Sequence, residues 1–156
     1  MALDPKNVKK VLIRVDFNVP MELGVIKDFT RLYAPIPTIR HFINLGVKPV
    51  LISHLGRPKN KDKLHSLKPL VSPLSKALKT KVTFVDNILD YHSVLEGLNN
   101  VDVLLLENLR FFKGELENDF EFSKLLSNYG DIYVNDAFSV SHRDHASVCS
   151  ILNFFP

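Results

Sequence analysis

Short apolar runs and helix-like stretches alternate along the chain. The apolar runs predict buried strands over residues 11–17, 50–52, 82–85, 101–106 and 132–134. Apolar residues spaced by three and four, or flanking proline and glycine, predict helices over residues 38–45, 67–78, 93–98 and 119–129. Such alternation of strand and helix is typical of an α/β fold. We therefore expect a three-layer αβα sandwich with a parallel, Rossmann-like sheet, in which residues 1–156 form a single domain.

Three further segments have their own patterns. Residues 24–28 predict a turn followed by a brief extended return, and the polar, basic residues 59–68 predict an exposed loop. The residues from 148 onward resemble the start of a helix whose apolar face has no partner within this chain. We expect Cys149 to be a small apolar filler in that helix.

The arginines are distributed unevenly over these predicted elements. Four of the six fall in loops that follow strands: Arg31, Arg57, Arg110 and Arg143. Right-handed crossovers bring the carboxyl ends of parallel strands to one rim, so we expect these four guanidinium groups to converge. Their mutual repulsion would cost stability unless an anion such as a phosphate offset it. Arg14 lies within a predicted strand, where a buried guanidinium needs a partner.

Other polar residues share the predicted rim. His54 and Gly56 stand beside Arg57 at the end of strand 50–52, which favours a ligand contact. Asp16 and Asn18 follow the first strand, where they would either bind ligand hydroxyl groups or cap a turn. His142 and His145 are too few for a metal site without further ligands.

The charge and the apolar content of the sequence limit the kinds of ligand and the location that we expect. The net charge of +3 permits an anionic ligand, and because the lysines are scattered over loops and segment starts, a small anion fits better than nucleic acid. The first residues lack the apolar core of a signal peptide and no apolar run reaches the ~18 residues that span a bilayer, so we expect a cytoplasmic protein.

Nucleotide-binding and nucleophilic motifs are missing from the sequence. The six glycines form neither G-x-G-x-x-G nor a Walker-type loop, which argues against a nucleotide site in this chain. Cys149 is the only cysteine, so there is no disulfide framework, and no G-x-S-x-G elbow is present.

Five motifs together resemble the phosphoglycerate kinase family: RVDFNVP at 14–20, PTI at 37–39, SHLGRP at 53–58, LLLENLRF at 104–111 and YVNDAFSVSHRDHAS at 133–147. The resemblance extends over essentially the whole chain, but over only the amino-terminal half of the family's two-domain protein. That half binds the triose substrate. The other, carboxy-terminal half carries the nucleotide site and is absent from this chain.

The resemblance also implies roles for individual residues. It makes Arg31 the catalytic arginine and makes Asp16 and Asn18 contacts to the hydroxyl region of the substrate. It implies contacts to the non-transferred phosphate from His54, Arg57, Arg110 and Arg143, and further substrate contacts from Phe17, Leu55 and Gly56. Asp144 stands where the family generally has a small residue, so its carboxylate would offset part of the positive charge.

The implied reaction is ATP-dependent phosphorylation of 3-phosphoglycerate to 1,3-bisphosphoglycerate. We expect this chain to bind the triose as a monomer without turnover, and to bind no cofactor, metal, nucleic acid or membrane itself. Mg-ATP or Mg-ADP would bind to the carboxy-terminal domain. The acceptor is a carboxylate that is ionised at neutral pH, so no general base is required.

Two other functions agree with the residues alone. Asp16 at a strand end, with Asn18 two residues on, also suits a self-contained aspartyl-phosphate α/β domain. A non-catalytic module that binds anionic metabolites or nucleic acid would likewise use a cluster of arginines.

Overall fold

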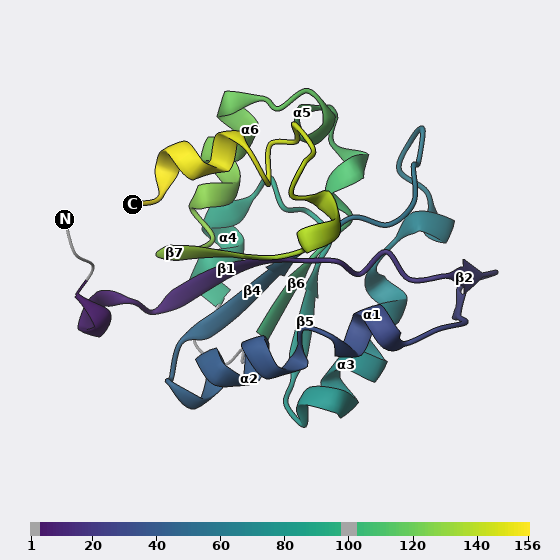
Figure 1. Ribbon diagram of the computed structural model, residues 1–156, viewed down its shortest axis with the longest axis horizontal. Helices are drawn as coiled ribbons and strands as arrows, with labels where there is room; N and C mark the ends of the chain where they lie inside the picture. The colour runs from purple at the N-terminus through teal and green to yellow at the C-terminus, as the bar shows by residue number, and fades with distance from the viewer. Residues whose placement is uncertain (1–3, 98–102) are drawn as a thin grey trace.

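A parallel five-stranded sheet forms the centre of the molecule (Figure 1). The computed structural model describes residues 4–97 and 103–156. The strand order is β5-β6-β4-β1-β7, and the strands are β1 (Lys10–Val15), β4 (Lys48–Ile52), β5 (Val82–Val85), β6 (Val103–Leu106) and β7 (Ile132–Asp136). The expected α/β fold with a parallel sheet is therefore confirmed. Residues 98, 101 and 102, where predicted elements begin or end, lie outside the described residues.

Helices cover both faces of the sheet. On one side lie α1 (Thr30–Tyr33), α2 (Ile36–Asn44) and α3 (Val71–Leu78). On the other side lie α4 (Tyr91–Glu96), α5 (Lys113–Leu116) and α6 (Phe120–Ser127). Figure 1 shows α1 to α3 on the opposite side of the sheet from α5 and α6. This division follows from the strand order. The chain moves toward one edge of the sheet from β1 through β4 to β5, and then moves back through β6 to β7. Because crossovers are right-handed, reversing the direction places the connecting helices on the other face.

Shorter elements complete the fold. The extended return predicted at 24–28 belongs to a hairpin of β2 (Met21–Glu22) and β3 (Val25–Ile26). The described 3-10 helices are η1 (Pro5–Asn7), η2 (Lys63–His65), η3 (Lys68–Leu70), η5 (Leu109–Phe111), η6 (Phe138–Val140) and η7 (Ser150–Phe154). Among the residues described, no helix is long and apolar enough to span a membrane.

Alternation along β1 divides the core into two layers. Val11, Ile13 and Val15 pack on the side of α2 and α3, whereas Leu12 packs on the side of α6. Arg14 has the same parity as Leu12 and is fully buried. The strand therefore places one guanidinium inside the layer that α5 and α6 cover.

The predicted helix over 67–78 begins later than expected, at Val71. Pro69 lies in the 3-10 helix η3, and Pro73 lies in the first turn of α3, where a missing backbone N–H costs little. Leu67 and Leu70 are nevertheless fully buried. The apolar spacing thus identified the buried side chains correctly, while the prolines determined where the α-helix starts.

The prediction of an unpartnered carboxyl-terminal helix is wrong. Ile151 in η7 is fully buried in the layer that contains α6. The ring centroids of Phe154 and Phe120 lie 4.8 Å apart, and Phe155 stacks on Tyr133 at 5.8 Å. Cys149 is exposed, so it does not fill the core as expected. The segment folds back over the sheet as a 3-10 helix because its aromatic residues find partners there.

Candidate anion-binding site

A cavity of about 300 Å³ lies at the carboxyl ends of β1, β4, β6 and β7. Its lining residues are Asp16, Asn18, Arg31, His54, Gly56, Arg57, Arg110, Ser139, Val140 and Arg143. The structure therefore brings together eight of the ten residues proposed from the sequence. The cavity adjoins the point where β4 leads to α3 on one face and the neighbouring β6 leads to α5 on the other, which is where open α/β sheets bind ligands.

The four arginines that line the cavity differ in their own contacts. Arg110 donates from Nη1 to the Gly56 carbonyl at 2.7 Å, and Arg31 donates from Nη1 to the Asn18 carbonyl at 2.8 Å. Arg57 and Arg143 are exposed, and within residues 4–97 and 103–156 neither side chain has a hydrogen bond or salt bridge. Two guanidinium groups thus remain available to a ligand.

Arg110 is the buried member of the four. Burial lowers the pKa of its guanidinium, and the nearby positive charges of Arg14, Arg143 and Arg57 lower the pKa further. The Nε atom of Arg110 is also buried without a hydrogen-bond partner in the described structure. A bound anion would relieve the repulsion among these charges.

His54 is held as a neutral ring. Arg14 Nη2 lies 2.9 Å from His54 Nδ1, and because a guanidinium can only donate, Nδ1 must accept. The ring proton therefore resides on Nε2, which remains a donor. Burial, followed by the charges of Arg14 and Arg110, lowers the pKa of His54 to about 3.

Asp16 is the carboxylate of the cavity. Burial alone would raise its pKa, but hydrogen bonds from Ser139 and from the Asn18 N–H, together with the charge of Arg31, leave the pKa below its usual value. The Ser139 hydroxyl donates to Asp16 Oδ2 at 2.6 Å, and Arg31 Nη1 lies 3.8 Å from the same oxygen. Asp16 is therefore ionised at neutral pH with partners of its own.

Two of the proposed contact residues lie outside the cavity. Phe17 and Leu55 are buried in the core, and their backbone N–H groups donate to Ser53 Oγ and Asn108 Oδ1. They occupy the right loops, but alternation along the chain turns their side chains away from the cavity. Asp144 is exposed, does not line the cavity and forms no salt bridge with Arg143 among the described residues.

The expectation that all four arginines lie in loops is wrong for two of them. Arg31 lies in α1, and just before this helix Asp28 accepts from the Thr30 N–H at 2.8 Å. Arg110 lies in the 3-10 helix η5, whose first turn is capped by Asn108. Both elements are one turn long, too short for an apolar periodicity to reveal them.

Asn108 is a site residue whose importance the sequence reasoning missed. Its Oδ1 accepts from the N–H groups of Leu55 and Arg110, and its Nδ2 donates to the carbonyls of Leu55 and His65. One buried amide thus ties the loop after β4 to the loop after β6. Gly56 follows Leu55 in the same loop. Its φ is +61°, and a Cβ there would lie 2.7 Å from the His65 ring, so the position favours glycine.

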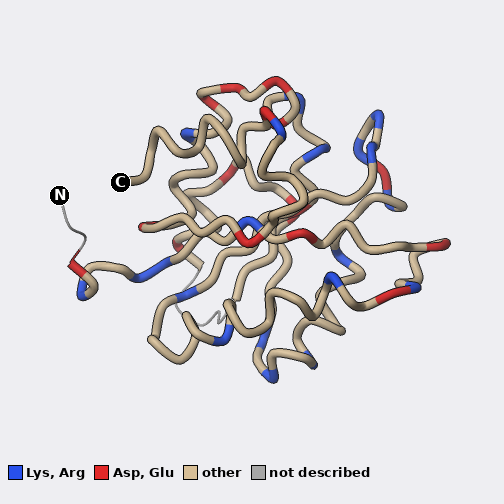
Figure 2. Tube along the Cα trace, viewed as in Figure 1, with Lys and Arg blue, Asp and Glu red and all other residues tan. Residues whose placement is uncertain are grey.

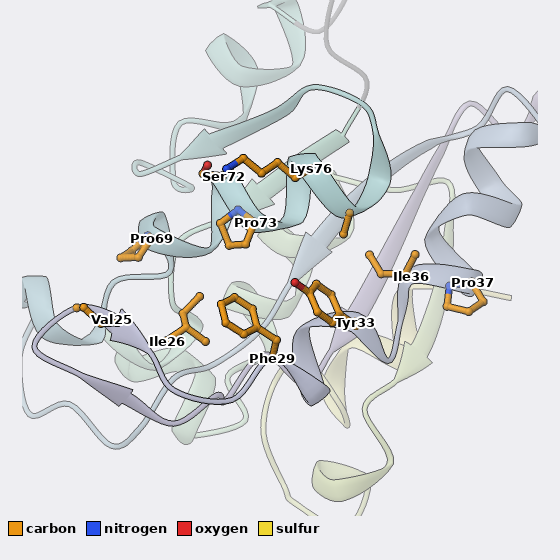
Figure 3. A pocket seen from close by; sticks show the side chains of 12 residues that line it. Val25, Ile26, Phe29, Tyr33, Ile36, Pro37, Pro69, Ser72, Pro73 and Lys76 are labelled. Carbon is orange, nitrogen blue, oxygen red and sulfur yellow. The ribbon is translucent and has the colours of Figure 1, made fainter.

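A second cavity has different chemistry (Figure 3). It measures about 950 Å³ and lies between the β2-β3 hairpin, α1 and α3, where the rings of Phe29 and Tyr33 stack at 5.6 Å. Of the described residues that line it, only Lys76 is charged. An anion therefore fits the cavity of about 300 Å³ better. The two cavities meet different residues of α1, since Arg31 lines one and Tyr33 lines the other.

Comparisons with known proteins relate the chain to one family. The family model described as phosphoglycerate kinase matches residues 3–156. A phosphoglycerate kinase of Wolbachia sp. subsp. Brugia malayi (strain TRS) is 49% identical over 150 residues, which cover 95% of this chain and 38% of that protein. One from Wolinella succinogenes is also 49% identical over 150 residues, with coverages of 95% and 37%.

Solved structures give the same result. The structure of phosphoglycerate kinase from Coxiella burnetii superimposes with a TM-score of 0.83 at 38% identity, covering 94% of this chain and 37% of that one. The crystal structure from Pyrococcus horikoshii OT3 gives 0.82 at 34% identity, covering 95% and 38%. The chain thus spans less than two fifths of the length of these relatives, and it belongs to the phosphoglycerate kinase family.

Proposed function

We propose that this chain is the triose-binding domain of a phosphoglycerate kinase and that it binds 3-phosphoglycerate in the arginine-lined cavity. The observation that supports this most is the convergence of four arginines, two of which have no partner within the described structure. In this proposal Arg57, Arg110 and Arg143 bind the phosphate, and the Nε2–H of His54 donates a further hydrogen bond. Asp16 and Asn18 lie where the hydroxyl group would sit.

The proposed reaction needs charge stabilisation more than proton transfer. The carboxylate of 3-phosphoglycerate is already ionised at neutral pH, so it accepts a phosphoryl group without a general base. We assign Arg31 to the charge on the transferring phosphoryl group, because its side chain is 52% exposed at the edge of the cavity. An arginine in such a role can contribute ~10³ to 10⁵ in rate.

We also propose that the nucleotide and its metal bind outside this chain. No group of three or more His, Cys, Asp or Glu side chains in residues 4–97 and 103–156 could hold a metal ion. The six glycines of the sequence also form no phosphate-binding loop. We therefore place Mg-ATP on another domain of the longer protein, and this chain alone should bind the triose without turnover.

Thermal unfolding in the presence of 3-phosphoglycerate tests the proposal. At a ligand concentration one hundred times Kd, binding to the folded state adds ~2.7 kcal/mol to the free energy of unfolding. Arg57→Ala removes a charge-assisted hydrogen bond worth ~1.5–3 kcal/mol and should weaken binding about tenfold or more. Arg40→Ala, which removes an arginine outside the cavity, is the matched control and should keep the shift in Tm.

Two outcomes would overturn the proposal. The first is a Tm that 3-phosphoglycerate does not change at any concentration. The second is tight, salt-sensitive binding to oligonucleotides with no preference for phosphoglycerate, which would identify a nucleic-acid-binding module instead.

A further inference from the structure

Arg14 connects the interior of the protein to the cavity. Its guanidinium is fully buried and donates to three acceptors: Ser147 Oγ at 3.0 Å, the Val15 carbonyl at 2.6 Å and His54 Nδ1 at 2.9 Å. Of these acceptors, only His54 lines the cavity. The orientation of the Arg14 guanidinium therefore decides how the His54 ring is held.

Glu115 supplies the opposite charge to Arg14 from the far side of Ser147. It belongs to α5 and is fully buried. Its Oε1 accepts from the Ser147 N–H at 2.7 Å and its Oε2 accepts from the Ser147 hydroxyl at 2.6 Å. The charge of Glu115 also raises the pKa of Arg14, against the larger effect of burial. The sequence reasoning assigned Glu115 no role.

Glu115 sets the direction of the Ser147 hydroxyl, and Arg14 sets the direction of the bonds that follow, because its guanidinium can only donate. Because Glu115 can only accept, the Ser147 hydroxyl must donate to it and must present its lone pairs to Arg14 Nε. That contact fixes the rotation of the guanidinium, so that Nη2 donates to His54 Nδ1. The ring proton of His54 is consequently kept on Nε2.

We propose that Glu115 is a positioning residue, which acts through Ser147 and Arg14 to hold His54 in its Nε2–H tautomer as a hydrogen-bond donor to the ligand. The inference rests on the proposed function, since the ligand is 3-phosphoglycerate. The tautomer of His54 distinguishes this positioning role from a purely structural one. If Glu115 only stabilised the fold, the network could be weakened without changing the tautomer.

The direct test is ¹⁵N NMR of histidine-labelled chain, which distinguishes the two ring nitrogens. The wild-type His54 should be the neutral Nε2–H tautomer. Ser147→Ala keeps both buried charges but removes the hydroxyl between them, and at least a tenth of His54 should then become Nδ1–H. Glu115→Gln replaces an acceptor by an amide donor and should shift the tautomer further. Glu117→Gln removes an exposed charge two residues away and should leave His54 unchanged.

Affinity for 3-phosphoglycerate gives the second readout. Ser147→Ala should weaken binding about threefold and Glu115→Gln about tenfold, with Glu117→Gln unchanged. An Nδ1–H tautomer in the wild type, or a folded Ser147→Ala with the wild-type tautomer and affinity, would overturn the proposal. Failure of Ser147→Ala to fold would also count against it, because the network would then serve stability. If the wild type binds no 3-phosphoglycerate, the proposed function fails, whereas the NMR result still shows whether the network sets the tautomer.

Discussion

The substitution His54→Asn tests the electrostatics of the cavity most sharply. In the folded chain the pKa of His54 is lowered to about 3 by burial and by the charges of Arg14 and Arg110, from 6.5 in the unfolded chain. Between these two values the unfolded state binds a proton that the folded state does not. The stability contributed by the neutral ring is therefore fully present above pH 6.5 and is lost as the pH falls toward 3.

The magnitude follows from linkage. Each pH unit in this window changes the free energy of unfolding by ~1.4 kcal/mol per proton, so His54 alone should cost about 2 kcal/mol between neutral pH and pH 5. Asparagine cannot titrate, and its Oδ1 can replace Nδ1 as the acceptor for Arg14. His54→Asn should therefore remove this part of the pH dependence while keeping the hydrogen bond.

Denaturant unfolding at half-unit steps from pH 7.5 to pH 5.0 measures the effect. The pKa of His145 is also lowered, first by burial, so its contribution acts in the same direction and persists in the variant. The difference between the two curves isolates His54. His92→Asn, which replaces an exposed histidine, is the control. A His54→Asn curve parallel to that of the wild type down to pH 5.0 would refute the electrostatic argument.

Three further predictions concern the core, the loops and Asp16. Gly130→Ala places a Cβ 2.7 Å from that of Leu12, so we expect a loss of ~1–3 kcal/mol in denaturant unfolding, whereas Gly97→Ala, where a Cβ meets nothing within 4 Å, should be neutral. Asn108→Ala removes the side-chain partner of four backbone groups, three of them buried, and should lower the free energy of unfolding by about 3 kcal/mol. Acetyl phosphate with Mg²⁺ should leave Asp16 unmodified by mass spectrometry, because its carboxylate is already bound by Ser139; labelling would favour an aspartyl-phosphate domain.

Strands and longer helices were predictable from the sequence because burial imposes a pattern. Each of the five strands forms where an apolar run stands, and the residues that pack α3 and α6 follow helical spacing. One-turn elements such as α1 and α5 were missed, since four residues cannot display a period. The carboxyl-terminal segment was misjudged because its partners, Phe120 and Tyr133, are distant in sequence.

The rim of the sheet was predictable for a different reason. Parallel topology alone brings strand ends together, so arginines that follow different strands could be assigned to one cavity. What topology cannot provide is side-chain contact across the rim. The hydrogen bond from Ser139 to Asp16 is one example, and the hydrogen bonds by which Asn108 joins two loops are another. Both depend on loop conformations that a short-range sequence pattern does not encode.

The pairing of the charged side chains explains why the cavity has unpaired positive charge. Two carboxylates are already bound by side chains: Asp16, which lines the cavity, accepts from Ser139, and the buried Glu115 accepts from Ser147 beside Arg14. The negative charge near the site therefore serves to orient side chains, while Arg57 and Arg143 have no hydrogen-bond or ion-pair partner in the described structure. Because unpaired guanidinium groups repel one another, the free chain carries an electrostatic cost that an anion removes on binding. Charged residues of both signs are spread along the chain (Figure 2) and the net charge is only +3. The convergence of four arginines on one cavity, more than the total charge, therefore favours a small anionic ligand.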